Sequence, residues 1–165
     1  MKIAVIGYSG SGKSTLAEIL GKKYGLPVLH MDATFWYGNW QSRTKIEQAA
    51  IVEKFLADNP DGWVIDGNYS KICPQRFSEC DEVYFLNYNR FFCYGQAKKR
   101  YRKYKGTARP DCPCPEKFDL EFAIWILFRG RTKRHRKFYK KVTENANCAH
   151  TFKSRKKLIE YLNKI

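Results

Sequence analysis

Short apolar runs alternate with longer runs of helical spacing along the whole 165-residue chain. Five of the short runs have the length and the apolar, branched or aromatic side chains of strands, and they lie at 2–6, 28–31, 63–65, 83–86 and 148–152. The segments between them predict helices at 14–24, 42–57, 70–79, 90–104, 118–128, 131–143 and 155–163. Strands that alternate with helices favour an α/β fold in which a parallel sheet carries helices on both faces.

Capping residues and helix breakers refine three of these helices. Ser42 is the expected N-cap of the helix at 42–57, and Ser154 is that of the last helix. Pro74 disturbs the short helix at 70–79. The buried face of the 42–57 helix is expected to contain Ile46, Ala49, Ala50, Ile51 and Phe55.

The length and composition favour one ordinary globular domain. The chain has no run of about 18 apolar residues, so we expect no membrane-spanning helix, and its first residues lack the charged-then-apolar pattern of a secretory signal. These features favour a cytoplasmic protein. Its six cysteines are then expected to be reduced thiols rather than disulfides, and they are Cys73, Cys80, Cys93, Cys112, Cys114 and Cys148.

Residues 7–14 match the phosphate-binding pattern G-x-x-x-x-G-K-[ST] at every fixed position. Glycines let such a loop wrap closely, so that its N–H groups point at phosphate oxygens, and the following helix adds its dipole. Lys13 is expected to reach the β- and γ-phosphates and the Ser14 hydroxyl to ligate Mg²⁺. The chain is therefore expected to bind a nucleoside triphosphate, with ATP and Mg²⁺ as cofactors, through Gly7, Tyr8, Ser9, Gly10, Ser11, Gly12, Lys13, Ser14 and Thr15.

The formal net charge of +15 is concentrated in one segment. Residues 98–141 contain 16 Lys or Arg and 4 Asp or Glu, whereas the other 121 residues contain 15 and 12. Such a segment is expected to face a polyanion. The phosphates of a small nucleotide and the backbone of a nucleic acid both fit this expectation, and a solvated surface that only aids solubility is the alternative.

Five stretches together resemble the bacterial DNA topology modulation (FlaR-related) proteins. The first is 2–17, which includes the phosphate-binding loop, and the most family-specific is 63–70, with Asp-Gly-Asn-Tyr near its centre. The others are 27–32, 107–111 and 154–156, so the resemblance covers nearly the whole chain in order. The family takes its name from an effect on DNA topology, whereas its build is similar to that of adenylate and shikimate kinases.

The resemblance implies a three-layer P-loop NTPase fold of the nucleoside-monophosphate-kinase-like type. It implies a five-stranded parallel sheet and a basic helical lid at about residues 100–137, within one domain that spans 1–165. The chain departs from the family at Asn87, where the fourth strand commonly ends in Leu-Asp. Because Asn87 has no negative charge to offer a cation, the metal-side carboxylates are expected to be Asp32 and Asp66.

Asp32 and Asp66 each follow an apolar strand, so a parallel sheet would bring both carboxylates to its C-terminal edge, where such folds bind ligands. Phosphoryl transfer requires charge neutralisation and an acceptor oxygen held in line. The likeness to shikimate-type kinases implies that Asp32 acts as general base or as a water-mediated Mg²⁺ partner. Asp66 is the second metal-side candidate, although its Gly67-Asn68 neighbours also fit a simple turn.

Arginines of the basic segment are candidates for clamping phosphates, because a guanidinium binds two oxygens at once. Arg100 and Arg109 are the expected catalytic pair, and Arg109 lies in a turn-rich stretch that can close over the site and exclude water. Arg90 and Arg102 are further candidates. From the related kinases, Arg155 at the start of the last helix is expected near the adenine.

Three further features keep more than one interpretation. The aromatic residues of the loop at 33–41 fit an acceptor pocket or packing against the next helix equally well, and they are Phe35, Trp36, Tyr37 and Trp40. Cys112 and Cys114 suggest half of a zinc site, but structural zinc usually takes four ligands, and His135 and Cys93 do not lie at a convincing spacing. His30 is expected to pack rather than to react.

These features lead to three hypotheses about function. The first is a kinase that transfers the γ-phosphate of ATP to a small-molecule acceptor, such as a nucleoside or nucleotide, which the sequence does not identify. The second is a nucleic-acid-binding DNA topology modulator that uses the basic face with ATP as a switch, although no known nucleic-acid-binding signature is present. The third is a kinase of nucleic-acid ends, which would use both features.

Overall fold

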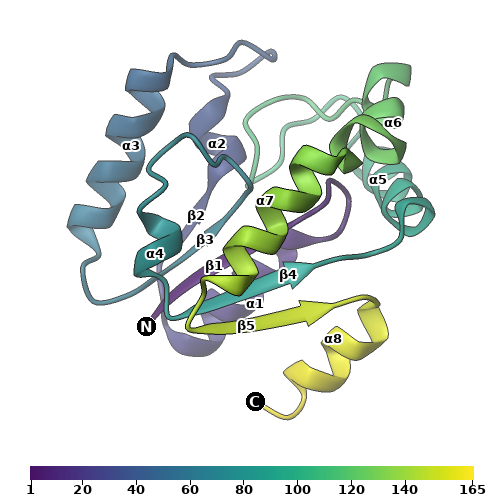
Figure 1. Ribbon diagram of the computed structural model, residues 1–165. Helices are drawn as coiled ribbons and strands as arrows, with labels where there is room; N and C mark the ends of the chain where they lie inside the picture. The colour runs from purple at the N-terminus through teal and green to yellow at the C-terminus, as the bar shows by residue number, and fades with distance from the viewer.

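A computed structural model describes residues 1–165 as a three-layer α/β structure (Figure 1). Its five strands are all parallel and lie in the order β2-β3-β1-β4-β5. They are β1 (Lys2–Gly7), β2 (Val28–His30), β3 (Trp63–Asp66), β4 (Glu82–Leu86) and β5 (Cys148–Phe152). The predicted parallel sheet is confirmed, and every predicted strand end lies within one residue of the observed one.

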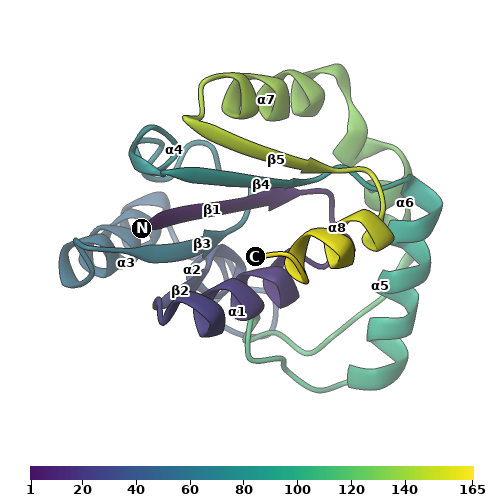
Figure 2. The same cartoon turned by 90° about the horizontal axis from the view of Figure 1, so that it is seen from below.

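Helices cover both faces of this sheet. They are α1 (Lys13–Tyr24), α2 (Met31–Phe35), α3 (Lys45–Asp58), α4 (Arg76–Glu79), α5 (Arg90–Tyr104), α6 (Leu120–Leu127), α7 (Lys133–Glu144) and α8 (Arg155–Leu162), with a 3₁₀ turn at Arg129–Arg131. Figures 1 and 2 show α1 and α8 on one face, α3, α4 and α7 on the other, and α5 and α6 beyond the carboxyl ends of the strands. None of these helices is long and apolar enough to cross a bilayer.

The core lies between the sheet and these helices and contains a cluster of 28 buried hydrophobic residues. The central strands β1, β3 and β4 are buried on both faces, which is why their sequences are continuous apolar runs rather than alternating ones. Trp63 and Tyr84 are among the largest fully buried side chains. This rigid centre fixes the loops at the carboxyl edge of the sheet.

The start of α3 corrects the prediction that Ser42 caps this helix. Thr44 is the N-cap: its side chain accepts from the Glu47 N–H, and the Glu47 carboxylate accepts from the Thr44 N–H at 2.8 Å. This reciprocal pair satisfies two N–H groups, which a serine without a Glu or Gln three residues later does not do. Ser42 instead forms an isolated antiparallel bridge with Trp36.

The predicted buried face of α3 is also partly wrong. Ile46 is 84% exposed and Ile51 is exposed, whereas Gln48 and Val52 are buried. Ala50 is exposed as well, so three of the five expected apolar positions point to solvent and only a narrow stripe of the helix meets the core. Gln48 tolerates burial because its amide donates to the Arg43 carbonyl at 2.8 Å.

Two segments near the site differ from their expected structure. The aromatic loop expected at 33–41 begins inside α2, so Asp32 lies in the first turn of a helix directly after β2. The helix expected at 70–79 is reduced to the four residues of α4. By contrast, α5 begins and ends where the sequence predicts, with the Asn89 side chain accepting from the Phe91 N–H as its cap.

Candidate functional site

The loop between β1 and α1 has the conformation that its glycines predict. Gly10 and Gly12 have φ values of 79° and 89°, in the left-handed region that favours glycine, and a Cβ at Gly10 would overlap the Cys93 carbonyl of α5. Gly12 caps α1 without a side-chain hydrogen bond, so the first N–H groups of this helix remain available to an anion. The loop forms an anion-binding cradle at the carboxyl end of β1.

Lys13 folds back over this cradle. Its Nζ donates a hydrogen bond to the Tyr8 carbonyl at 3.2 Å. Burial lowers the pKa of Lys13, while the nearby carboxylates of Asp32 and Asp66 oppose that shift. The ammonium is therefore held within the loop, where phosphate oxygens are expected.

Ser14 and Asp66 meet beside the loop. The Ser14 hydroxyl donates to Asp66 Oδ2 at 2.9 Å, because the register of β1 and β3 places Asp66 opposite Val5, next to the start of the loop. One hydroxyl and one carboxylate fit Mg²⁺, which usually takes only one or two protein oxygens beside waters and phosphates. No group of three or more His, Cys, Asp or Glu side chains is arranged to hold a metal by itself.

Asp66 has a second partner that the sequence did not reveal. Its Oδ1 lies 2.6 Å from Nδ1 of His30, the last residue of the neighbouring strand β2. The expectation that His30 only packs is therefore incomplete, since the ring contacts a functional carboxylate. No local sequence pattern indicates this contact, because it depends on β2 and β3 being neighbours.

Asp32 is held apart from the Ser14–Asp66 pair. Its Oδ1 accepts a hydrogen bond from the Tyr69 hydroxyl at 2.6 Å, and the carboxylate is exposed at the carboxyl edge of the sheet. No direct contact joins Asp32 to Ser14. Of the two carboxylates predicted on the metal side, the structure brings Asp66 to Ser14 and leaves Asp32 facing the open side.

The turn after β3 positions several of these groups. The amide of Asn68 hydrogen-bonds to the peptide groups of Gly7, and Tyr69 binds Asp32. This turn is organised by Arg76 of α4, which is fully buried and has no carboxylate partner. Its guanidinium donates to the carbonyls of Tyr69 and Cys73 at 3.1 and 3.3 Å and also to that of Ile72.

The two arginines predicted to be catalytic are paired with carboxylates of the 105–119 loop. Arg100 Nε lies 2.9 Å from Glu116 Oε1, and Arg109 Nε lies 2.7 Å from Glu116 Oε2. Arg109 also donates to Asp111 Oδ2 at 2.8 Å. Glu116 is only 5% exposed, and nothing in the sequence distinguished this carboxylate as the common partner of the two arginines.

Arg131 is a site residue that the sequence analysis missed. Its guanidinium carbon lies 3.7 Å from the centre of the Tyr8 ring, and it donates to the Ile126 carbonyl and the Cys93 sulfur at 3.1 and 3.3 Å. It has no carboxylate partner, although it lies directly against the phosphate-binding loop. As one of 16 cations in the basic segment, it carried no distinguishing signal.

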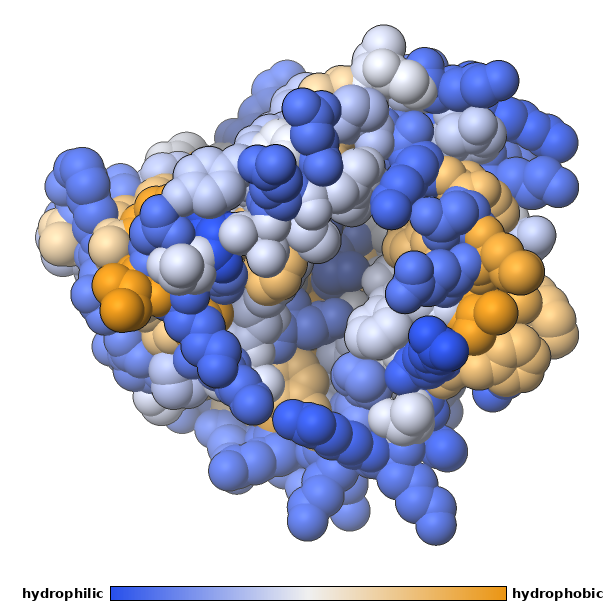
Figure 3. All heavy atoms as spheres, turned by 90° about the horizontal axis from the view of Figure 1, so that it is seen from above, coloured by the Kyte–Doolittle hydropathy of each residue, from blue (hydrophilic) through white to orange (hydrophobic).

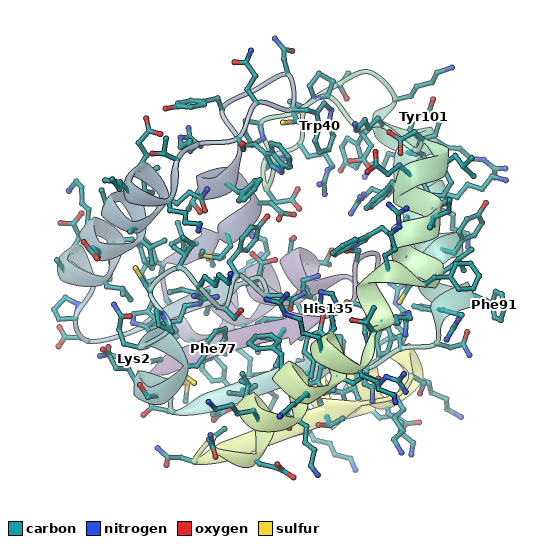
Figure 4. The ribbon with its side chains drawn as sticks, turned by 45° about the horizontal axis from the view of Figure 1, so that its top comes forward. Lys2, Trp40, Phe77, Phe91, Tyr101 and His135 are labelled. Atoms are coloured by element: carbon teal, nitrogen blue, oxygen red, sulfur yellow. The ribbon has the colours of Figure 1, made fainter.

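Aromatic side chains line the open side of the site. The Phe35 and Tyr69 rings lie 5.2 Å apart, and Trp36 contacts Trp40 edge-on. Trp40 reaches the 105–119 loop, where its indole N–H donates to the Pro115 carbonyl at 3.2 Å (Figure 4). Figure 3 shows that this face of the molecule is hollowed at its centre. Through Trp40 these aromatics therefore connect α2 to the 105–119 loop rather than packing only against α3.

The structure offers no zinc site at the two lid cysteines. Cys112 and Cys114 are buried, and Cys114 Sγ accepts from the Trp40 N–H at 3.3 Å. Burial raises the pKa of the Cys112 thiol to about 11. His135 lies instead against Trp125 of α6, and no third ligand approaches the pair.

The other side chains predicted to bind nucleotide or phosphate form no hydrogen bond or ion pair with Lys13, Ser14, Asp32 or Asp66. Thr15, Arg102 and Arg155 are exposed on α1, α5 and α8. Arg155 lies near Tyr88, whose buried hydroxyl has no hydrogen-bond partner. Arg90 lies over the Phe128 ring at 5.7 Å. No contact of these side chains with the loop supports or opposes their predicted roles.

Comparison with known proteins finds similar folds only among solved structures. No protein-family model and no curated protein match the chain. A deoxyadenosine kinase from M. mycoides with bound dATP matches with a TM-score of 0.58 and 16% identity, over 99% of this chain and 98% of that one. The chain shares the fold of that structure, a five-stranded parallel sheet of the P-loop, nucleoside-monophosphate-kinase-like type.

Two further structures agree with this placement. The same deoxyadenosine kinase with bound dCTP gives a TM-score of 0.54 and 16% identity over 100% of both chains. An uncharacterized protein from Eubacterium ventriosum gives 0.53 and 14% over 100% of this chain and 99% of that one. At such identities the likeness concerns the fold, so an activity has to be argued from the side chains of this chain.

Proposed function

We propose that this protein is an ATP-dependent kinase of a small hydroxylated acceptor. The observation that carries the proposal is the pairing of Ser14 Oγ with Asp66 Oδ2 at 2.9 Å beside the anion-binding loop, with Asp32 bound separately by Tyr69. Phosphoryl transfer needs one carboxylate near the metal and another near the attacking hydroxyl. Asp66 and Asp32 fit these two roles.

Each residue then has one task in the reaction. Lys13 and the N–H groups of the loop bind the phosphates of ATP. Ser14 and Asp66 would hold Mg²⁺, which when bound neutralises charge on the transferring group. Asp32 accepts the proton of the acceptor hydroxyl as that oxygen bonds to the γ-phosphorus, while the bond from this phosphorus to the β–γ bridging oxygen breaks and ADP leaves. The Tyr69 hydroxyl orients the Asp32 carboxylate for this step.

A nucleoside is the acceptor class that we propose. The structural neighbours named as deoxyadenosine kinases support it. In this chain Arg100 and Arg109 are already paired with Glu116, and Asp111 adds a second carboxylate to Arg109. Part of the positive charge of both guanidiniums is therefore already balanced by carboxylates of this chain, which favours a neutral acceptor over a nucleotide. The aromatic rings beside Tyr69 offer faces on which a base can stack.

Membership in the DNA topology modulation (FlaR-related) group is part of the same proposal. Its support is the stretch at 66–69, because each polar side chain in it contacts the site. Asp66 binds Ser14, Asn68 binds Gly7, and Tyr69 binds Asp32. The most family-specific stretch of the sequence is thus the part that organises the proposed active site.

Mg²⁺-dependent ADP release with a panel of acceptors tests the kinase proposal. The panel contains nucleosides, nucleoside monophosphates, other small hydroxylated metabolites and oligonucleotide ends. We expect one nucleoside to stimulate release, and Lys13→Ala and Asp32→Asn each to lower kcat/KM by about 100-fold or more. Lys22→Ala, at an exposed lysine of the same helix, is the matched control and should not change it. ATP binding without stimulation by any acceptor would contradict the proposal.

A nucleic-acid-binding role is the second candidate, and the unpaired charge of the basic segment favours it. Of the 16 cations at 98–141, only Arg100, Arg109, Lys117 and Lys140 form ion pairs, which leaves twelve without an acidic partner. Most of these twelve lie on α5 and α7.

Salt dependence separates this candidate from the kinase. Binding to an oligonucleotide through many phosphates should weaken by about 1,000-fold or more between about 50 and 200 mM salt. The same change of salt should alter binding of a nucleoside far less. Oligonucleotide affinity that is absent at both salt concentrations would remove this candidate.

A further inference from the structure

His30 connects the metal-side carboxylate of the site to the surface of α1. His30 and Asp66 are the last residues of neighbouring strands and face each other in the register of β2 and β3. His30 Nδ1 lies 2.6 Å from Asp66 Oδ1, and His30 Nε2 lies 2.8 Å from Glu18 Oε1. Both ring nitrogens are therefore occupied, and the ring is held between two carboxylates.

The two oxygens of Asp66 are divided between two partners. Oδ1 contacts His30, and Oδ2 accepts the hydrogen bond from Ser14 at 2.9 Å. The side chains of His30 and Asp66 are only 11% and 6% exposed, so little water is available to replace either partner. With Oδ1 held by the ring, the carboxylate cannot turn freely, and Oδ2 is the oxygen presented to Ser14.

We propose that His30 is a positioning residue that fixes the Asp66 carboxylate for a divalent cation bound together with the nucleotide. The inference rests on the proposed function, because it takes Ser14 and Asp66 as the protein ligands of that cation. Groups that orient a ligand from behind typically change metal affinity by about 10- to 100-fold when removed. Glu18 has the supporting role, since its contact with Nε2 fixes the orientation of the ring.

Three variants separate positioning from simple packing. His30→Leu removes both contacts of the ring. His30→Asn keeps an N–H donor near the position of Nδ1 and loses the contact with Glu18, whereas Glu18→Gln keeps a polar partner for the ring and removes the charge. His150→Asn is the matched control, because His150 lies on the edge strand β5 among Glu82 and Tyr161, away from the loop.

The measurement is the calorimetric dissociation constant of ATP, determined once in EDTA and once in saturating Mg²⁺. The ratio of the two constants reports how strongly the protein couples nucleotide and cation, and it requires no turnover. We expect His30→Leu to lower this ratio by about 10- to 100-fold, while the constant in EDTA changes less than about twofold. In His30→Asn and Glu18→Gln the ratio of the two ATP dissociation constants should stay close to that of wild type. In His150→Asn it should equal the wild-type ratio.

Each outcome decides the inference. An unchanged ratio in folded His30→Leu overturns it. If that variant does not fold, His30→Ala, which also removes both contacts of the ring, takes its place, and an unchanged ratio in folded His30→Ala overturns the inference as well. A wild-type protein whose ATP affinity does not respond to Mg²⁺ contradicts the proposed function itself and the inference with it, whereas a normal wild-type ratio that His30→Leu leaves unchanged contradicts the inference alone.

Discussion

The side-chain amide of Asn68 forms two hydrogen bonds with the main chain of Gly7. Its Oδ1 accepts from the Gly7 N–H at 3.1 Å, and its Nδ2 donates to the Gly7 carbonyl at 2.8 Å. The Tyr139 hydroxyl donates to the same carbonyl at 3.1 Å. The turn after β3 and the helix α7 thus both hold the first residue of the phosphate-binding loop.

Replacing Asn68 by alanine should loosen this hold. The buried Gly7 N–H would lose its partner, so we expect a loss of about 1–3 kcal/mol in the free energy of unfolding together with weaker ATP binding. Urea unfolding and ATP titration measure the two effects. Asn147→Ala, at an exposed position before β5, is the control. Equal stability and equal ATP affinity in the two variants would show that the hydrogen bonds between Asn68 and Gly7 do not stabilise the phosphate-binding loop.

Arg131 is expected to bind the donor phosphates, because it lies against Tyr8 of the loop and has no carboxylate partner. Arg131→Gln should weaken ATP binding by about 10- to 100-fold, the range for a lost hydrogen bond to a charged group. Arg129→Gln, two residues away and exposed, should leave the affinity unchanged. Similar ATP affinities in the two variants would assign Arg131 to packing alone.

Glu116 is expected to hold the lid together, because its two carboxylate oxygens pair with Arg100 and Arg109. Glu116→Ala leaves both guanidiniums without this partner and should cost about 3 kcal/mol of unfolding free energy. Limited proteolysis should then cut faster within 105–119. Glu121→Ala, an exposed carboxylate on α6 without an ion pair, should leave both stability and cleavage rate unchanged, and equal cleavage of the two variants would argue against the role of Glu116.

The capping box of α3 should make stability depend on pH in acid. Hydrogen bonds from Tyr37 and Thr44 lower the pKa of Glu47 to about 2 from an ordinary value of 4.5. A carboxyl with a lowered pKa in the folded state stabilises the protein above its unfolded value, and this contribution is lost as the pH falls toward the folded value. The midpoint of urea unfolding should therefore be higher for wild type than for Glu47→Gln at pH 5. The difference between the two midpoints should become smaller as the pH falls toward 2. Glu53→Gln should show no such trend, and a gap that stays constant with pH would disprove the assignment.

Most of the fold could be predicted because its signals are local. The helix α5 has its cap at Asn89 and a polar, turn-rich sequence after Tyr104, so both of its ends are marked in the chain. The start of α3 was missed because two hydroxyl residues compete there, and the glutamate three residues after Thr44 decides between them. The outward direction of Ile46 depends on which side of the helix meets the sheet, which the local sequence does not specify.

The arrangement of the candidate site could be predicted where a local sequence motif determines it. It could not be predicted where it depends on contacts between residues far apart in the chain. Residues 7–14 have a recognisable pattern, and the strand ends place Asp66 beside Ser14. The contact of His30 with Asp66 requires the strand order, which brings the ends of β2 and β3 together. Glu116 and Arg131 resemble many other charged residues in the chain, and only the folded structure shows their contacts with Arg100 and with Tyr8.

The buried guanidinium of Arg76 has a consequence for how the site opens. A four-residue helix is not stable alone, and the carbonyls of Tyr69, Ile72 and Cys73 depend on the same cation. The backbone from 67 to 79 should therefore behave as one cooperative unit, whose amide protons exchange with solvent at a common free energy. When this unit unfolds locally, Gly7 loses its hydrogen bonds to Asn68 and Asp32 loses its hydrogen bond to Tyr69, so the phosphate-binding motif and the Asp32 carboxylate lose their support in one event.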